Sequence, residues 1–155
     1  MGEAFVSAAA ESPAGLEIVG LGSCIALFLH DPRTGCGGLA HILLPGAVVS
    51  SAQRAEAATP SRALESLLDG LRRRRIGREH LVVKMAGGSR MFSGAARRRP
   101  GPGERNVQAM LEALAAVSLK PAAMDVGGAA GRTLRADLTD GSLTISSLRG
   151  ESVRL

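Results

Sequence analysis

The stretch "CIALFLHDPRTGCGGLAHILLP" (residues 24–45) decides the fold of this chain. Two apolar runs, 24–29 and 39–45, flank a turn that contains Asp-Pro and three glycines, a composition typical of two strands joined by a turn. Short apolar runs are ambiguous, so a helix that starts at Cys24 remains an alternative. The favoured interpretation is a pair of neighbouring buried strands whose side chains meet.

Upstream and downstream of this stretch the pattern continues. Residues 16–22 are another short apolar run that predicts a buried strand, whereas residues 1–14 are predicted to be a loose lead-in. Leucines and alanines recur at helical spacing over 59–75, where Thr59 is a candidate N-cap and Pro60 suits the first turn. Arginines gather at the end of this segment, where the helix dipole favours them.

The C-terminal half completes an α/β pattern. Residues 80–88 predict a strand that runs into a glycine pair, and 104–117 predict a second amphipathic helix. The sequence "TDGS" (139–142) between the apolar runs 132–138 and 143–148 is a strong hairpin signal. The order of strands, helix, strand, helix and strands predicts an α/β fold with mixed strand directions, in a single domain over residues 1–155.

Composition limits the function classes. Aromatic residues make up only 2% of the chain, which argues against a nucleic-acid platform built on base stacking. The net charge is +5, with arginine clusters at 72–75 and 97–99 that are either solvated surface or a footprint for an acidic partner.

Two cysteines twelve positions apart do not form a secreted disulfide framework. With no signal peptide and no apolar run long enough for a membrane span, we expect a cytoplasmic protein without membrane insertion.

Cys24 and His41 are the candidate catalytic pair. A cysteine nucleophile needs a thiolate, and a nearby imidazole supplies both a proton acceptor and a stabilising charge. The glycines before Cys24 are consistent with a sharp turn that lets a substrate approach. A small buried cysteine and a core histidine are the structural alternative for the same two residues.

Other arrangements of these residue types fit less well. Cys24, His30, Cys36 and His41 fall within eighteen residues, but their spacings do not match the close cysteine pairs of structural zinc sites. Cys24 and Cys36 also lack the Cys-x-x-Cys spacing of a redox pair. The glycine pairs do not form a phosphate-binding motif. No metal site is predicted.

The stretch "GLGSCIALFLHDPRTGCGGLAHILLPG" (20–46) resembles the opening signature of the CheD family, the chemoreceptor glutamine deamidases of bacterial chemotaxis. The resemblance continues in three further blocks in the same order. These are "VKMAGGSRMF" (83–92), "GERNV" (103–107) and "DVGGAAGRTL" (125–134). Together they span most of the chain, from about residue 15 to 150.

This resemblance implies a fold and an activity. The expected fold is α/β/β/α, with mixed β-sheets packed together and flanking helices, similar to toxin deamidases such as cytotoxic necrotising factor. The implied activity is hydrolysis of receptor glutamine amides to glutamate and ammonia through a cysteine thioester, with no metal or organic cofactor. By position, Cys24 matches the family nucleophile and His41 the general base. The backbone N–H groups around Ser23 and Cys24 are candidate oxyanion donors.

One position departs from the family pattern. The third catalytic member is usually a threonine six positions before the cysteine, where this chain has Ile18, which cannot form a hydrogen bond to orient His41. The implied partners are methyl-accepting chemoreceptors and a CheC-type phosphatase of the response regulator. The alternative function is therefore a catalytically weak CheD-like binding protein that engages receptors or such a phosphatase. A cysteine peptidase would share the Cys–His chemistry but finds no support in the other blocks.

Overall fold

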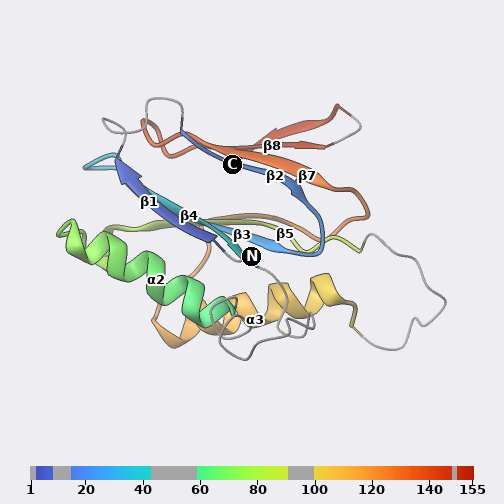
Figure 1. Cartoon of the computed structure of the whole chain (residues 1–155), viewed down its shortest axis with the longest axis horizontal. Coiled ribbons are helices and arrows are strands. Elements are labelled where there is room, and N and C mark those ends of the chain that lie inside the picture. Colours follow the sequence, from blue (N-terminus) through green and yellow to red (C-terminus); the bar gives the residue numbers. More distant parts are fainter. Residues whose placement is uncertain (1–2, 9–14, 43–58, 91–99, 148–149) are drawn as a thin grey trace.

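A computed structural model describes residues 3–8, 15–42, 59–90, 100–147 and 150–155 (Figure 1). Its elements in chain order are β1 (Glu3–Ala8), β2 (Leu16–Leu21), β3 (Ile25–Asp31), β4 (Cys36–Ile42), α2 (Pro60–Arg73), the short 3-10 helix η1 (Arg78–His80), β5 (Val82–Gly87), α3 (Pro102–Ala116), β6 (Ala123–Val126), β7 (Arg132–Ala136), β8 (Leu143–Ser147) and β9 (Ser152–Arg154). The strands form two sheets, in the orders β1-β4-β3-β5-β6 and β2-β7-β8-β9. The predicted α/β class with mixed strand directions is confirmed.

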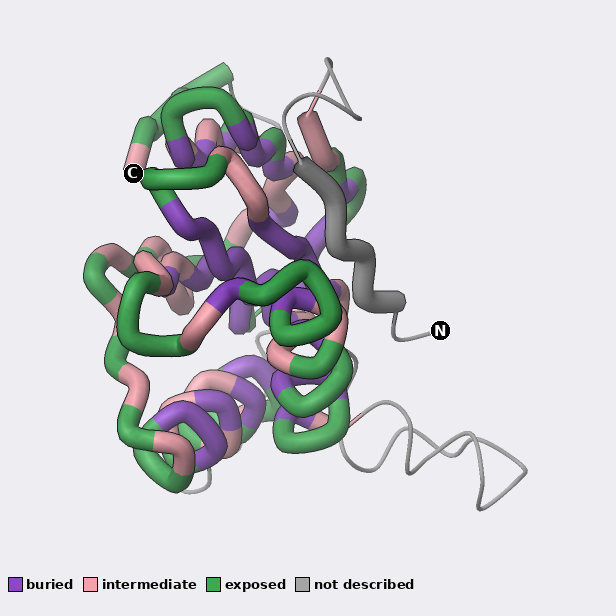
Figure 2. The backbone as a smooth tube through the Cα atoms, turned by 90° about the vertical axis from the view of Figure 1, so that its left-hand side faces the viewer, coloured by how far each residue is buried: buried purple, intermediate pink, exposed green. Residues whose placement is uncertain are grey.

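The five-stranded sheet is the middle layer of the molecule. Both α2 and α3 lie on one of its faces and the four-stranded sheet lies on the other (Figure 1). Along β3, Leu27 and Leu29 belong to the core under the helices. Ala26 and Phe28 belong to the core between the sheets. β3 is buried along its whole length because both of its faces are covered. Buried backbone segments gather in the interior of the molecule (Figure 2).

The described residues contain three of the four expected layers. The resemblance implies α/β/β/α, but in the part of the chain that is described the order is α/β/β, with both α-helices on the same side. In β7 and β8, Leu134 and Ile145 are buried while Arg135 and Ser146 are exposed. This alternation is typical of a sheet with one solvated face, so the outer face of this sheet needs no helical cover.

The two predicted hairpins are confirmed. β3 and β4 pair antiparallel, with Ala26 opposite His41 and Asp31 opposite Cys36. β7 and β8 pair antiparallel around the predicted Asp-Gly turn. β3 begins at Ile25, so a helix starting at Cys24 is excluded.

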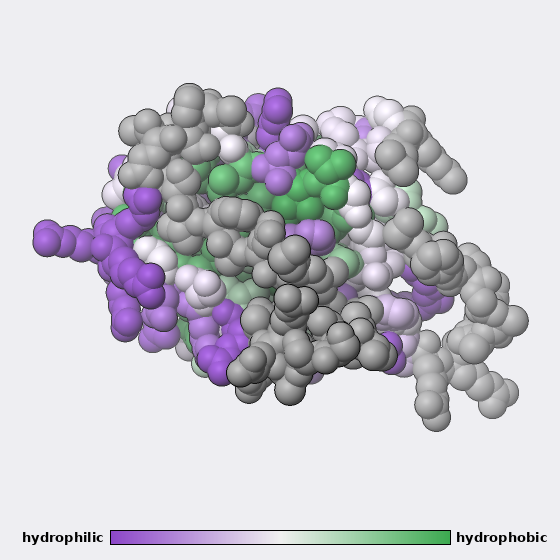
Figure 3. All heavy atoms as spheres, in the orientation of Figure 1, coloured by the Kyte–Doolittle hydropathy of each residue, from purple (hydrophilic) through white to green (hydrophobic). Residues whose placement is uncertain are grey.

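The predicted helices are also present. The Thr59 side chain accepts a hydrogen bond from the Arg62 N–H at 3.4 Å, as an N-cap does, and Pro60 occupies the first turn. α3 begins at Pro102, two residues earlier than predicted. Arginines 72–75 are exposed where α2 ends, and hydrophilic side chains project at that side of the molecule (Figure 3). Arginines 97–99 lie outside the described residues.

The N-terminal segment differs from the expectation of a loose lead-in. Residues 3–8 form β1, which pairs antiparallel with β4 and forms one edge of the five-stranded sheet. The short strands β6 and β9 were not predicted either. In the ranges given above, no helix is long and apolar enough to cross a membrane.

Candidate active site

Cys24 lies in the tight turn between β2 and β3, formed by residues 22–24. Its side chain is half-buried against the core between the sheets. The Gly88 N–H donates to the Cys24 carbonyl at 2.8 Å and the Ser89 N–H donates to the Gly22 carbonyl at 2.9 Å. The Asn106 side-chain amide donates to the Ser23 carbonyl at 2.7 Å. Every carbonyl of the turn is therefore fixed by a donor.

Glycine at position 87 is required by this close approach. Gly87 has a φ of 110°, which residues with a side chain rarely adopt. A Cβ at this position would lie 2.2 Å from the Cys24 carbonyl oxygen. The glycine pair at 87–88 thus allows β5 to end directly against the Cys24 turn, as expected for a close backbone approach rather than a phosphate loop.

His41 and Cys24 lie at the same end of the β3–β4 hairpin. The bond between Gly88 and the Cys24 carbonyl continues the β3–β5 register, in which Ile25 is opposite Gly87, so Cys24 extends β3 by one residue. His41 is opposite Ala26, two positions from Cys24, and residues two apart point to the same face. Such diagonal neighbours have Cα atoms roughly 7–8 Å apart. The two side chains therefore share the face toward the second sheet.

His41 and Ile18 line one pocket of about 400 Å³. Its lining comes from β2, β4 and the residue before β2: Gly15, Leu16, Glu17, Ile18, Val19, Leu39 and His41. Ile18 is 9% exposed and belongs to the core between the sheets. Val19, which also lines this pocket, is 72% exposed. The third family position is therefore beside His41, but it offers only a hydrocarbon side chain.

The protonation of Cys24 is set by its surroundings. Burial raises the pKa of the Cys24 thiol, while the backbone N–H of Cys24 acts in the opposite direction. The net shift is upward, so the neutral thiol is the resting form at neutral pH. A nucleophilic role then requires a base to remove the proton as attack begins.

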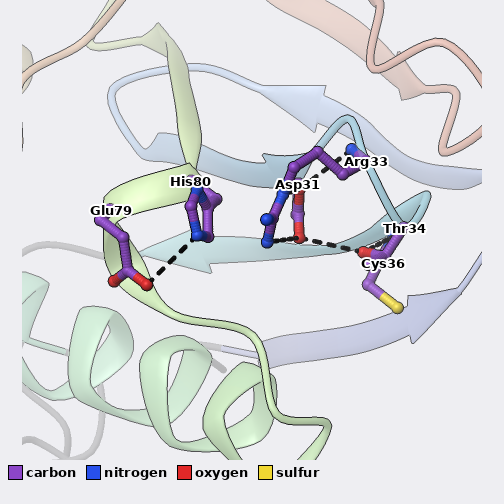
Figure 4. Close-up of polar contacts among 6 residues, drawn as sticks. All are labelled: Asp31, Arg33, Thr34, Cys36, Glu79 and His80. Carbon is purple, nitrogen blue, oxygen red and sulfur yellow. Dashed lines mark hydrogen bonds and ion pairs between the residues drawn. The ribbon is translucent and has the colours of Figure 1, made fainter.

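The other cysteine and histidine of the stretch lie at the far end of the hairpin. Cys36 is opposite Asp31, seven residues along β3 from Cys24, a separation of roughly 23 Å along a strand. Figure 4 shows Cys36 within the turn, where its N–H donates to Thr34. The His30 ring Nε2 donates to the Leu138 carbonyl at 2.9 Å. His30 and Cys36 therefore lie at the opposite end of the hairpin from Cys24 and His41. The four residues considered as a zinc site are not brought together, and Cys24 and Cys36 do not meet as a redox pair.

The described ranges contain no cluster of three or more histidine, cysteine or acidic side chains that could hold a metal ion. Both cysteines are free thiols.

Comparison with known proteins identifies the family. A family model described as "CheD chemotactic sensory transduction" matches residues 43–147, more than half of the 155 residues. The chain belongs to the CheD family. The blocks at 103–107 and 125–134 lie within the matched range, whereas Cys24 and His41 precede it.

Curated relatives of this CheD chain cover most of its length. A protein of Geobacter metallireducens named "Probable chemoreceptor glutamine deamidase CheD 2" is 38% identical over 143 residues, which cover 90% of this chain and 88% of the relative. Proteins named "Probable chemoreceptor glutamine deamidase CheD" from Clostridium botulinum and Archaeoglobus fulgidus are also similar. They are 35% identical over 139 residues (86% of this chain, 83% of the relative) and 33% identical over 135 residues (87% and 85%), respectively.

Proposed function

We propose that this CheD protein is a chemoreceptor glutamine deamidase, which hydrolyses glutamine side-chain amides of methyl-accepting receptors to glutamate and ammonia. The names of the relatives support this activity. The observation that carries the proposal is the placement of Cys24 and His41 on one face of adjacent strands, with His41 lining an open pocket. The active unit is a single domain over residues 1–155, and its two free thiols suit the reducing cytoplasm.

The chemistry follows from the state of the thiol. His41 accepts the proton of Cys24 as the sulfur attacks the amide carbon, because burial keeps the resting thiol neutral. The tetrahedral intermediate collapses, the C–N bond breaks, and His41 returns the proton to the departing ammonia. His41 then removes a proton from water and the hydroxide attacks the thioester carbon. The C–S bond breaks, His41 returns the proton to the departing sulfur, and glutamate and the free thiol are left.

The negative oxygen of the two tetrahedral intermediates needs hydrogen-bond donors. The backbone N–H groups of Ser23 and Cys24 are the donors of this proposal, because they belong to the same fixed turn as the nucleophile. Preorganised amides are effective since they need no reorientation as charge develops.

Ile18 supports a second candidate function. Without a polar group at this position, His41 lacks the family's orienting threonine, and a catalytically weak protein would act by binding receptors or a CheC-type phosphatase. We favour the enzyme because a thiol depends less than a hydroxyl on an oriented base.

Mass spectrometry of receptor peptides tests the enzyme directly. Incubation with the protein should increase the mass of a glutamine peptide by roughly one dalton, the change from amide to acid. Cys24→Ala should abolish this change while the protein stays folded. Cys36→Ala is the matched control, because Cys36 lies at the other end of the hairpin, and should retain activity within a few-fold.

The opposite pattern, with Cys36→Ala inactive and Cys24→Ala active, would refute the assignment of the nucleophile. If the wild-type protein bound receptor or phosphatase but released no ammonia, the binding function would replace the enzyme.

A further inference from the structure

Each of three consecutive carbonyl groups of the Cys24 turn accepts a hydrogen bond from its own donor. The Gly22, Ser23 and Cys24 carbonyls accept hydrogen bonds from Ser89 N, Asn106 Nδ2 and Gly88 N, at 2.9, 2.7 and 2.8 Å. The donors come from the segment after β5 and from α3. The orientation of every peptide group from 22 to 25 is therefore fixed.

Fixed carbonyls also fix the amides. A trans peptide group is planar, and its N–H points opposite to its C=O. With the Gly22 carbonyl turned toward Ser89, the Ser23 N–H must point away from Ser89, and with the Ser23 carbonyl turned toward Asn106, the Cys24 N–H must point away from α3. These are the two donors that the proposed deamidation requires.

Asn106 is the single side chain among the three anchors. The other two are backbone N–H groups, whose positions are set by the course of the chain after β5. Asn106 is fully buried on α3 and reaches a residue 83 positions earlier in the sequence. It is also the only asparagine in the chain.

The Oδ1 atom of Asn106 also bears on the role of this residue. This atom is buried and has no hydrogen-bond partner within the described residues. An unpaired buried acceptor destabilises a fold, and a leucine of similar shape would remove this acceptor but would leave the Ser23 carbonyl without its side-chain donor. Within the described residues, the hydrogen bond that the Asn106 side chain makes is the one to the Ser23 carbonyl.

We propose that Asn106 is a positioning residue that holds the Ser23 peptide group so that the Cys24 N–H faces the substrate oxyanion. The inference rests on the proposed deamidase function. Asn106 acts through the Ser23 peptide group, to which its side-chain amide donates. Loosening an oxyanion donor lowers kcat more than it weakens substrate binding, because the negative oxygen forms only after the bound amide begins to react.

The first test compares two α3 variants. Asn106→Leu removes the donor with little change in shape. Met110→Ala opens a cavity in the core beneath the same helix without touching the turn, and serves as the control for lost stability. For Asn106→Leu we expect kcat for receptor peptide to fall roughly tenfold to a hundredfold with KM nearly unchanged. Met110→Ala should keep both constants once they are corrected for the folded fraction.

Alkylation of Cys24 gives a readout that does not need deamidation. The Cys24 N–H favours the thiolate, so releasing the turn should move the midpoint of the pH profile for iodoacetamide alkylation upward in Asn106→Leu. Cys36→Ala is used as the background so that a single thiol reacts. Met110→Ala should leave the midpoint where it is.

Selective labelling tests the wild-type contact itself. Labelling with ¹⁵N-asparagine gives the signals of one side-chain amide, and one of its two protons should exchange with solvent far more slowly than in a free amide. Fast exchange of both protons would overturn the inference even if the variants did not fold. An unchanged kcat and alkylation midpoint in folded Asn106→Leu would also overturn it. A wild-type protein without deamidase activity would refute the proposed function alone, since the labelled amide and the alkylation profile still decide whether Asn106 holds the turn.

Discussion

Ile18 lies at the pocket of His41 in this CheD protein but offers it no hydrogen bond. The residue lines the same pocket as His41, and its side chain is packed among apolar residues between the sheets. Because a hydrocarbon side chain neither donates nor accepts a hydrogen bond, His41 relies on other groups for its orientation. This follows directly from the sequence at one position.

A hydroxyl at position 18 should therefore accelerate the reaction. We expect Ile18→Thr to raise the rate of single-turnover ammonia release roughly tenfold, equivalent to about 1.4 kcal/mol of barrier. Ile18→Val is the matched control, because valine has the shape of threonine without the hydroxyl, and should keep the wild-type rate. A folded threonine variant no faster than the valine variant would mean that another group already orients His41.

At this scale the sequence predicts part of the candidate site. Cys24 and His41 stand out because their residue types carry chemistry and because the blocks around them resemble a family. The role of Asn106 was not predictable, since its partner is the Ser23 carbonyl, a backbone group 83 positions away. The signal was present only as the asparagine of the "GERNV" block, to which no role could be attached.

Among the elements, the β3–β4 hairpin is the best-determined one, and Asp31 closes it. The buried carboxylate accepts hydrogen bonds from the Arg33 N–H at 3.0 Å and from the Thr34 hydroxyl at 3.2 Å (Figure 4). Burial acts to raise the pKa of Asp31, but the bonds from Arg33 and Thr34 outweigh it and the net pKa is lowered. The charged form therefore stabilises the turn.

The stability of the turn should depend on pH. We expect Asp31→Asn to lower the free energy of unfolding at pH 7 by about 1–2 kcal/mol, because the carboxylate bonds are lost. The folded pKa lies below the unfolded value of about 3.9, so the wild-type advantage is complete above that pH and disappears as the pH falls through the folded pKa.

Urea unfolding of both proteins at neutral and acidic pH measures this gap. The exposed Asp69→Asn on α2 is the control and should change stability by less than about 0.5 kcal/mol. A gap of constant size down to the lowest pH would show that the Asp31 charge does not stabilise the fold.

The elements that the sequence predicts share one property, a local pattern. Alternating or continuous apolar runs identify β2 to β5, an N-cap and helical spacing identify α2, and Asp-Gly identifies the β7–β8 turn. β1 was missed because its pairing partner is β4, in which Cys36 is opposite Ala8 and His41 is opposite Glu3, 28 and 38 positions away in the chain. β6 and β9 have four and three residues, too short for any period to show. The layer order is equally non-local, since it depends on which face each helix covers.

Across the whole molecule, Arg132 joins the two sheets. It is the first residue of β7, and its side chain is 12% exposed. The guanidinium donates to the Ser89 hydroxyl at 2.7 Å and forms a two-point contact with Asp125 on β6, at 3.2 Å for each pair. Ser89 also donates its backbone N–H to the Gly22 carbonyl. The second sheet is thus connected through Arg132 and Ser89 to the turn that carries Cys24.

This connection should make the two sheets unfold as one unit. Arg132→Lys keeps the charge but loses the planar fork, so we expect the free energy of unfolding to fall by about 1–3 kcal/mol. Arg135→Lys on the same strand is the control. The Arg135 side chain is 65% exposed and lies as far as 4.0 Å from its acidic partner Glu17, so this change should alter stability by less than about 0.5 kcal/mol.

Amide hydrogen exchange shows whether the two sheets unfold together or separately. In Arg132→Lys, the slowest amides of β3 and of β8 should lose protection by the same amount, since both exchange through global unfolding. Faster exchange confined to β7 and β8 would instead mean that the second sheet opens on its own, and that the Cys24 turn does not depend on it for its position.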